Sequence, residues 1–150
     1  MTARKLLLFR TGGRVFAVDA GAVREILPAT PPTRIPLSPD AVRGLVNVRG
    51  TLVTVVDAAL AIGVGDGGAP AAGGAADGAE RRLVLVEQRG RVVGLLVDAV
   101  MDLVAAGDTA PATAQPAGAV RPGVVAATGT AGGEPFAQLA IDVLLEPLLA

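Results

Sequence analysis

Arg49 offers the most specific chemistry in this chain, because it stands beside a glycine between two stretches rich in β-branched residues, 45–48 and 52–57. Gly50 gives the backbone the freedom that a tight turn requires, and the guanidinium is then free to project from that turn. A guanidinium binds a carboxylate in a planar, two-pronged geometry. The residues by themselves leave two interpretations open, a carboxylate-binding arginine or a solvent-exposed turn arginine.

Glu25 is the second candidate, in the segment Val23-Arg24-Glu25-Ile26. An acidic side chain flanked by Val23 and Ile26 indicates a strand edge where polar and apolar surfaces meet. The alternative is an ordinary solvated strand face, on which a charged residue needs no partner.

Catalysis is poorly supported, since the chain contains neither His nor Cys. It therefore lacks the commonest general acid and base and the usual ligands of a soft metal site. Asp57 ends an apolar run, as the phosphoacceptor of a receiver domain does, but the helices and the N-terminal acidic pair of such a domain are missing. We predict that Asp57 is a turn or cap residue, that the protein is not an enzyme and that it needs no cofactor or metal.

Charge and hydropathy argue against several classes of partner. The net charge is −1, no basic cluster exceeds Arg81-Arg82, and the three aromatic residues are all Phe, so nucleic-acid binding is not predicted. No apolar run approaches the ~20 residues that span a bilayer, and the four apolar residues 6–9 are too few for a signal peptide. We expect a cytoplasmic protein with no direct membrane insertion.

A degenerate repeat divides the chain, because residues 6–27 align without a gap on residues 83–104. Each copy begins with two short apolar runs around a glycine-containing turn, which is typical of a β-hairpin. The alternative is that any two Val- and Leu-rich hairpins look alike. The predicted strands cover 6–10, 14–19, 24–27, 45–48, 52–57, 83–88, 92–97, 102–105, 124–128 and 136–141. About five strands in each half favour small barrels, since closure removes sheet edges.

Little helix is expected. Ser38, Pro39 and Gly44 carry the signals of a short helix over 38–44, and residues 143–149 are a second candidate. Gly- and Ala-rich residues 63–80, within a linker of 61–80, and residues 105–118 are predicted to be loops, the former flexible.

The segment 42–57, which contains Arg43-Gly44, Asn47-Val48-Arg49-Gly50 and an apolar strand ending in Asp57, resembles the signature of the CheW family of chemotaxis coupling proteins. The upstream Val23-x-Glu25-Ile26 resembles the same family, and the likeness extends from about residue 6 to 149. It implies a mainly β fold of two packed, five-stranded SH3-like β-barrel subdomains with a hydrophobic groove between them. We accordingly expect one domain over 1–150, with a first barrel at about 5–60 and a second at about 81–149.

The resemblance also implies a function, that of an adaptor joining the cytoplasmic tips of chemoreceptors to the regulatory domain of a CheA-type histidine kinase. It assigns Arg49 to coupling and places Glu25 beside the receptor groove, and it gives Asp98 a hydrogen-bonded structural role. The expected receptor- and kinase-binding residues are Arg49, Glu25, Val23, Ile26, Val46, Asn47 and Gly50.

Three positions depart from the family pattern, since Thr54, Ala58 and Ala59 stand where Pro, Leu and sometimes Arg are usual. These differences leave two alternatives open. One is an adaptor of an accessory, non-flagellar chemosensory pathway, and the other is a non-catalytic double barrel that binds a peptide or a small molecule.

Overall fold

The computed structural model describes residues 5–37, 39–64, 81–105, 110–111, 123–131 and 133–149. These residues form two sheets with little helix, as predicted. Sheet A has the strand order β8-β1-β2-β11-β10-β9, and sheet B has the order β3-β6-β7-β5-β4. The strands of sheet A are β1 (Lys5–Thr11), β2 (Arg14–Asp19), β8 (Ala99–Ala105), β9 (Ala110–Pro111), β10 (Val125–Ala131) and β11 (Glu134–Leu139). Those of sheet B are β3 (Val23–Pro28), β4 (Val42–Val48), β5 (Thr51–Asp57), β6 (Arg82–Gln88) and β7 (Arg91–Val97).

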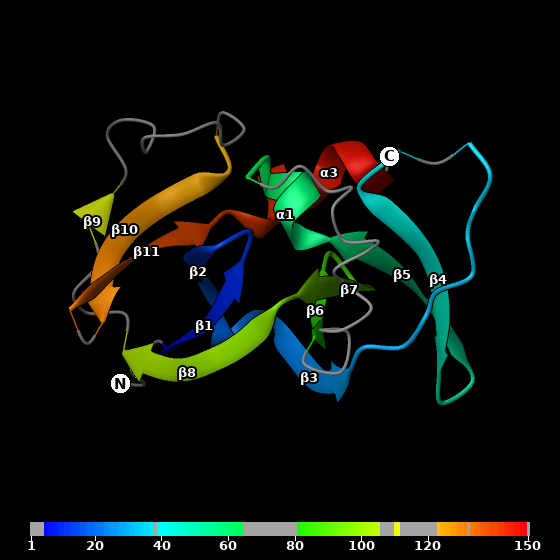
Figure 1. Ribbon diagram of the computed structural model, residues 1–150, viewed down its shortest axis with the longest axis horizontal. Helices are drawn as coiled ribbons and strands as arrows, with labels where there is room; N and C mark the ends of the chain where they lie inside the picture. The colour runs from blue at the N-terminus through cyan, green and yellow to red at the C-terminus, as the bar shows by residue number, and fades with distance from the viewer. Residues whose placement is uncertain are drawn as a thin grey trace.

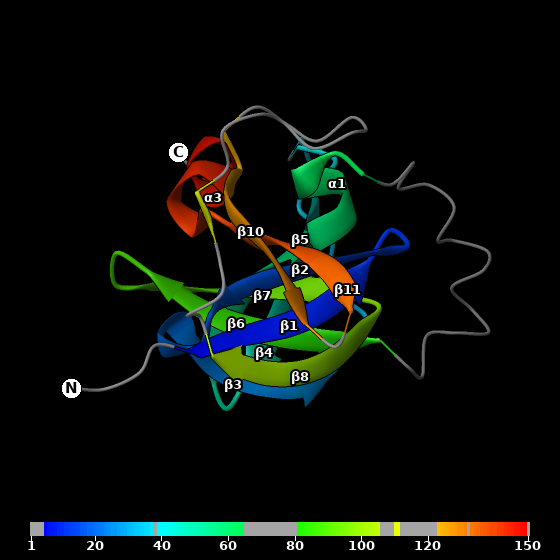
Figure 2. The same ribbon diagram turned by 90° about the vertical axis from the view of Figure 1, so that its left-hand side faces the viewer.

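The two sheets lie next to each other along the length of the molecule (Figure 1). Their edge strands lie on one side of the molecule, β8 below sheet A and β3 below sheet B, while the helices α1 (Ala58–Ile62) and α3 (Ile141–Leu149) lie on the opposite side (Figures 1 and 2). The molecule therefore has a strand-edge face and a helical face.

The repeat is present in the structure, but its strands are exchanged between the sheets. Hairpin β1–β2 pairs with β8, whereas the equivalent hairpin β6–β7 pairs with β3. The registers match, because Leu8 lies opposite Asp102 and its repeat partner Leu85 lies opposite Glu25. The expected assignment of one barrel to 5–60 and one to 81–149 is therefore wrong, since each sheet takes strands from both halves. In each half, the strand after the hairpin (β3 or β8) pairs with the hairpin of the other half. This exchange ties the halves together more firmly than a linker could.

The arrangement of two SH3-like subdomains holds, although neither sheet closes fully. Among the described pairings, sheet B ends at β3 and β4, which share no ladder. The chain beyond β3 reaches β4 through one bridge, in which Thr33 and Leu45 each donate an N–H to the other's carbonyl at 2.8 Å. Partial closure of this kind satisfies backbone groups that an open edge would leave to water.

The helix predicted over 38–44 does not form. Residues 40–41 are a turn and β4 begins at Val42, which pairs with Val56. Gly44 has a φ of 141°, and a Cβ there would lie 2.1 Å from the carbonyl oxygen of Thr33. The glycine thus serves the close approach of two strands, and strand pairing with burial of Val42 outweighs local helix signals.

The remaining elements agree closely with expectation. All ten predicted strands are found, although β11 stops at Leu139 and Ile141 starts α3, the predicted C-terminal helix. Helix α1 was not predicted and occupies the first residues of the expected linker, of which 65–80 lie outside the described residues. The expected loop 105–118 contains the end of β8 and all of β9, and its other residues lie outside the described ones.

The core is aliphatic and has three parts. The largest lies between the sheets and joins Phe9, Phe16 and Val18 of sheet A to Val84 and Leu95 of sheet B. A smaller cluster packs against each sheet, one formed by residues of sheet B and one by residues of sheet A. Burial of this non-directional surface holds the sheets together.

Candidate functional site

The β4–β5 hairpin turn places Arg49 at the tip of sheet B. Arg49 and Gly50 connect the paired residues Val48 and Thr51, and their φ angles are 51° and 87°. Two positive φ angles in a two-residue loop give the turn type that matches the twist of the strands. Asn47 accepts a hydrogen bond from the Gly50 N–H through its Oδ1 at 2.8 Å. Asn47 and Gly50 therefore shape the turn that displays Arg49.

Arg49 and Glu25 form a two-pronged ion pair. The Arg49 guanidinium donates one hydrogen bond to Glu25 Oε1 at 2.5 Å and a second to Oε2. Arg49 is 72% exposed and Glu25 is 28% exposed. Hydrogen bonding from Arg49 lowers the pKa of the Glu25 carboxyl, against the opposing effect of desolvation, and bonding to Glu25 raises the pKa of Arg49. Both groups are thus held in their charged forms.

This pair joins opposite ends of sheet B, since β3 and β4 are its two edge strands. Together with the Thr33–Leu45 bridge, it draws the edges of the curved sheet toward each other. The Glu25 carboxylate and the Arg49 guanidinium consequently lie at the rim of the sheet, where a partner could contact both.

Exposed apolar side chains lie on the same strand-edge face. Ile26 on β3, the edge of sheet B, is 40% exposed, and Met101 and Leu103 on β8, the edge of sheet A, are 40% and 52% exposed. Leu52, which follows the Arg49 turn, is 65% exposed. A charged pair beside exposed apolar residues is a composition found at protein-binding surfaces.

The predicted site residues divide into three groups. The structure brings Glu25, Arg49, Asn47 and Gly50 together, as described above, and Ile26, the residue after Glu25, is exposed. Val23 is half-buried against the inter-sheet core. Val46 is only 7% exposed and packs in the core of sheet B, so its predicted role as a contact residue does not fit its position. Alternation along β4 explains this, because Val46 and Asn47 point to opposite faces.

Sequence reasoning missed a second cluster of charges. Asp57, 2% exposed, accepts the Leu60 N–H at 3.2 Å and so caps α1, which confirms its predicted cap role. Its other oxygen lies 3.3 Å from Arg43 and 3.9 Å from Arg81. Asp98 is also hydrogen-bonded, as the resemblance implied, and accepts from the Gly12 N–H at 3.2 Å. No sequence pattern assigned Arg43 or Arg81 to Asp57, although a buried aspartate requires compensating charge.

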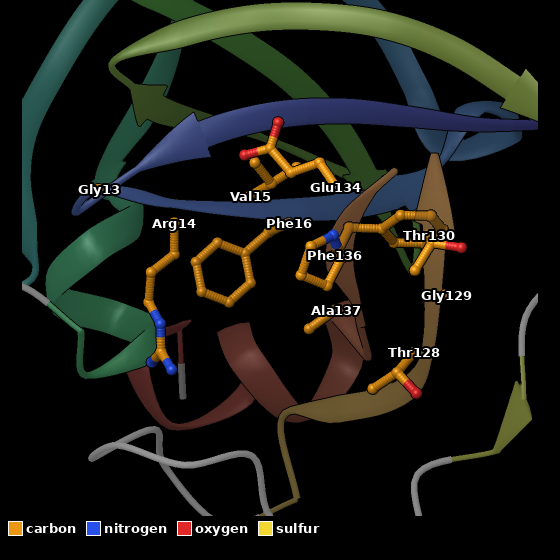
Figure 3. Close-up of a pocket in the computed structure, with 11 residues that line it drawn as sticks. Gly13, Arg14, Val15, Phe16, Thr128, Gly129, Thr130, Glu134, Phe136 and Ala137 are labelled. Carbon is orange, nitrogen blue, oxygen red and sulfur yellow. The ribbon is translucent and has the colours of Figure 1, made fainter. Parts of the chain in front are cut away.

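A cavity of about 570 Å³ opens on sheet A, away from this pair (Figure 3). It lies between β2 and the β10–β11 hairpin, and Val15, Phe16 and Phe136 supply apolar walls. Two residues before its hairpin turn, β10 has Gly129 where β4 has the buried Val46. Gly129 lines the cavity and adds no side chain to fill it.

Within the described residues, no group of three or more acidic side chains is placed to hold a metal ion. The same part of the chain contains no helix long and apolar enough to cross a membrane.

Comparison with known proteins gives one family. Residues 5–147 match the CheW-like domain. The chain is 40% identical over 106 residues to the chemotaxis protein CheW of Rhizobium meliloti, and 39% identical over 106 residues to the probable chemotaxis protein CheW of Rhizobium etli, covering 70% of this chain and 63% of each relative. The matched region is thus under two thirds of the length of these relatives.

The fold is also similar to that of a solved structure, the scaffolding protein TtCheW from Thermoanaerobacter tengcongensis, with a TM-score of 0.81 and 22% identity. That likeness covers 97% of this chain and 94% of the other and supports the two-sheet architecture. Since the family model spans nearly every residue, the chain belongs to the CheW-like family.

Proposed function

We propose that this chain is a non-catalytic adaptor of a chemotaxis pathway, which couples chemoreceptor cytoplasmic tips to the regulatory domain of a CheA-type histidine kinase in the cytoplasm. Membership of the CheW-like family and two relatives named as CheW chemotaxis proteins support an adaptor role. The pairing of Arg49 with Glu25 at an accessible rim is the observation that carries the assignment of the site.

The surface suits a helical partner. Ile26 on β3 and Met101 and Leu103 on β8 line the strand-edge face, and an amphipathic helix can lay its apolar residues against such a strip. The Arg49–Glu25 pair lies beside it and offers charges of both signs. Charge complementarity of this kind selects and orients partners more than it adds affinity.

The proposal excludes intrinsic catalysis. The chain has no His to accept a phosphoryl group, and within the described part no metal-binding group could assist phosphorylation of a carboxylate. The chain should therefore act by binding alone and raise kinase activity only when receptor and kinase are both present.

The test is a reconstitution with labelled ATP. Purified protein is incubated alone, with a CheA-type kinase, and with kinase plus a receptor cytoplasmic fragment, and co-purification is measured in parallel. We expect a three-way complex and stimulated kinase labelling only in the last mixture. Phosphorylation of this chain alone, or failure to co-purify with either partner, would contradict the adaptor function.

A further inference from the structure

Arg81 lies between two carboxylates that belong to different parts of the fold. Its side chain is 19% exposed, and its guanidinium lies 3.9 Å from Asp57 Oδ2 and 3.5 Å from Asp98 Oδ1. Asp57 ends β5 of sheet B. Asp98 follows β7 and precedes β8, at the point where the chain leaves sheet B for sheet A.

Asp98 continues the contact into sheet A. Its Oδ2 accepts from the Gly12 N–H in the β1–β2 turn at 3.2 Å, and its own N–H donates to the Arg10 carbonyl at 2.9 Å. A continuous path thus runs from the buried Asp57 through Arg81 and Asp98 to the tip of the β1–β2 hairpin.

The two hydrogen bonds that Asp98 makes to the β1–β2 hairpin are directional. The Arg81 contacts are ion pairs in which Nε makes no hydrogen bond, and they hold the Asp98 carboxylate by charge. The hydrophobic core between the sheets consists, in the described residues, of aliphatic side chains and two phenylalanines. Dispersion and burial favour contact but permit small rotations, and charge-assisted hydrogen bonds restrict the angle at which groups meet. Arg81 and Asp98 therefore lie where the angle between the sheets can be set.

That angle matters for the strand-edge face. Residue 81 immediately precedes β6, which carries the edge strand β3, and Asp98 immediately precedes the edge strand β8. A rotation of one sheet against the other would change the separation of Ile26 on β3 from Leu103 on β8.

We propose that Arg81 is a positioning residue, which fixes the angle between the two sheets and hence the spacing of the β3 and β8 edges. The effect on partner binding rests on the proposed function, but the effect on sheet geometry does not. Arg81 touches no partner itself and acts through Asp98.

Arg43 provides a matched control. It lies on β4 and contacts the same Asp57 oxygen at 3.3 Å, so it neutralises the buried carboxylate from within sheet B. Arg81→Met leaves Asp57 paired with Arg43, and Arg43→Met leaves it paired with Arg81. Both variants retain the apolar stem of the side chain. A difference between them reports the link to Asp98 rather than the loss of a positive charge.

Sheet geometry can be measured without any partner. The chain has no cysteine, so Arg89→Cys on the β6–β7 turn and Leu103→Cys on β8 would carry the only two spin labels. We expect a narrow distance distribution by pulsed electron spin resonance in this background, a broadened or shifted one with Arg81→Met, and no change with Arg43→Met. A distribution unaltered by Arg81→Met, or altered equally by Arg43→Met, would overturn the proposal.

Asp98→Ala removes the same contact by changing its more exposed partner. Arg81 then remains paired with Asp57, so no buried charge is left unpaired. This variant decides the question if Arg81→Met does not fold. It should reproduce the distance change, and Arg81→Met added to it should change nothing more; full additivity would contradict the shared path.

Binding of a receptor tip fragment, measured without the cysteine pair, should weaken about fivefold or more in Arg81→Met and in Asp98→Ala. Binding unchanged despite an altered distance would disprove the connection to the partner surface. If the unmodified protein binds no fragment, the adaptor function fails, and the distances alone still decide the role of Arg81.

Discussion

Two hairpins of sheet B end in the same dipeptide, Arg49-Gly50 in β4–β5 and Arg89-Gly90 in β6–β7. Both arginines have positive φ angles, 51° and 53°, and both glycines follow with 87° and 79°. Arg49 donates two hydrogen bonds to Glu25, whereas Arg89 has no ion pair within the described residues. Local sequence determines the turn, and tertiary placement determines whether its arginine meets a carboxylate.

The difference arises from β3. Its pairing with β6 has a bulge at Arg24, where Arg24 pairs with Glu87 on β6 while the next residue, Glu25, reaches across to Arg49. The β6–β7 hairpin thus contributes the strand residue Glu87 to an ion pair with β3, whereas the β4–β5 hairpin contributes the turn residue Arg49. The two turns are natural controls for each other.

The largest difference is expected in partner binding. Arg49→Glu places a second carboxylate beside Glu25 and reverses the charge offered to a partner, so affinity for a receptor tip fragment or a kinase regulatory domain should fall at least about tenfold. Arg89→Glu should stay within about twofold of the unmodified protein. Titration calorimetry measures both, with thermal melts to confirm folding. Equal losses in the two variants, or loss only through melting of Arg49→Glu, would assign Arg49 a structural role.

Reversing Glu25 sharpens the comparison. Glu25→Arg should weaken binding as Arg49→Glu does, since it sets two guanidinium groups against each other. The double variant Glu25→Arg, Arg49→Glu can rebuild the pair with its polarity inverted, so its thermal midpoint should return toward that of the unmodified protein. Its binding should remain weak because a partner meets each charge in the wrong place. Restored binding in the double variant would mean that the pair acts only by closing sheet B.

Backbone effects should be the same at both turns. Gly50→Ala and Gly90→Ala each force a Cβ into a left-handed conformation, although the space around both positions is open. Each should lower the free energy of unfolding by about 1–2 kcal/mol. Urea denaturation compares them, and a cost larger at Gly50 by more than ~1 kcal/mol would show that the ion pair and the turn are coupled.

Much of this architecture could be read from the sequence, because strands and turns are local. The positive-φ turns at Arg49 and Arg89 follow from Arg-Gly between β-branched runs. Non-local features could not be read in this way. The exchange of β3 and β8 between hairpins leaves no local trace, and the helix predicted over 38–44 had sound capping signals that the pairing of Val42 with Val56 overrode.

The site shows the same division. Arg49 and Glu25 were identified from their motifs, and their contact depends on curvature that brings the edges of sheet B together. Val46 is buried although its motif suggested a contact residue, because a motif records neighbours in sequence, whereas burial follows strand alternation. Asp57 is paired with Arg43 on β4 and with Arg81 just before β6, and no sequence pattern linked either arginine to Asp57.

The smallest expected effect is the pH dependence that the Arg49 pair gives to stability. The pKa of Glu25 lies below its ordinary value of 4.5 in the folded protein, chiefly because Arg49 donates hydrogen bonds to the carboxylate. A carboxyl whose folded pKa is depressed contributes stability above its unfolded pKa and loses that contribution as pH falls through the folded pKa. Unfolding free energies from urea denaturation should therefore fall more steeply below pH 4.5 in the unmodified protein than in Arg49→Gln. Arg89→Gln should follow the unmodified curve. The difference should shrink at high salt, because both groups are open to solvent. Parallel curves for Arg49→Gln and the unmodified protein would show that the pair adds nothing to folding, and Arg49 would then serve recognition alone.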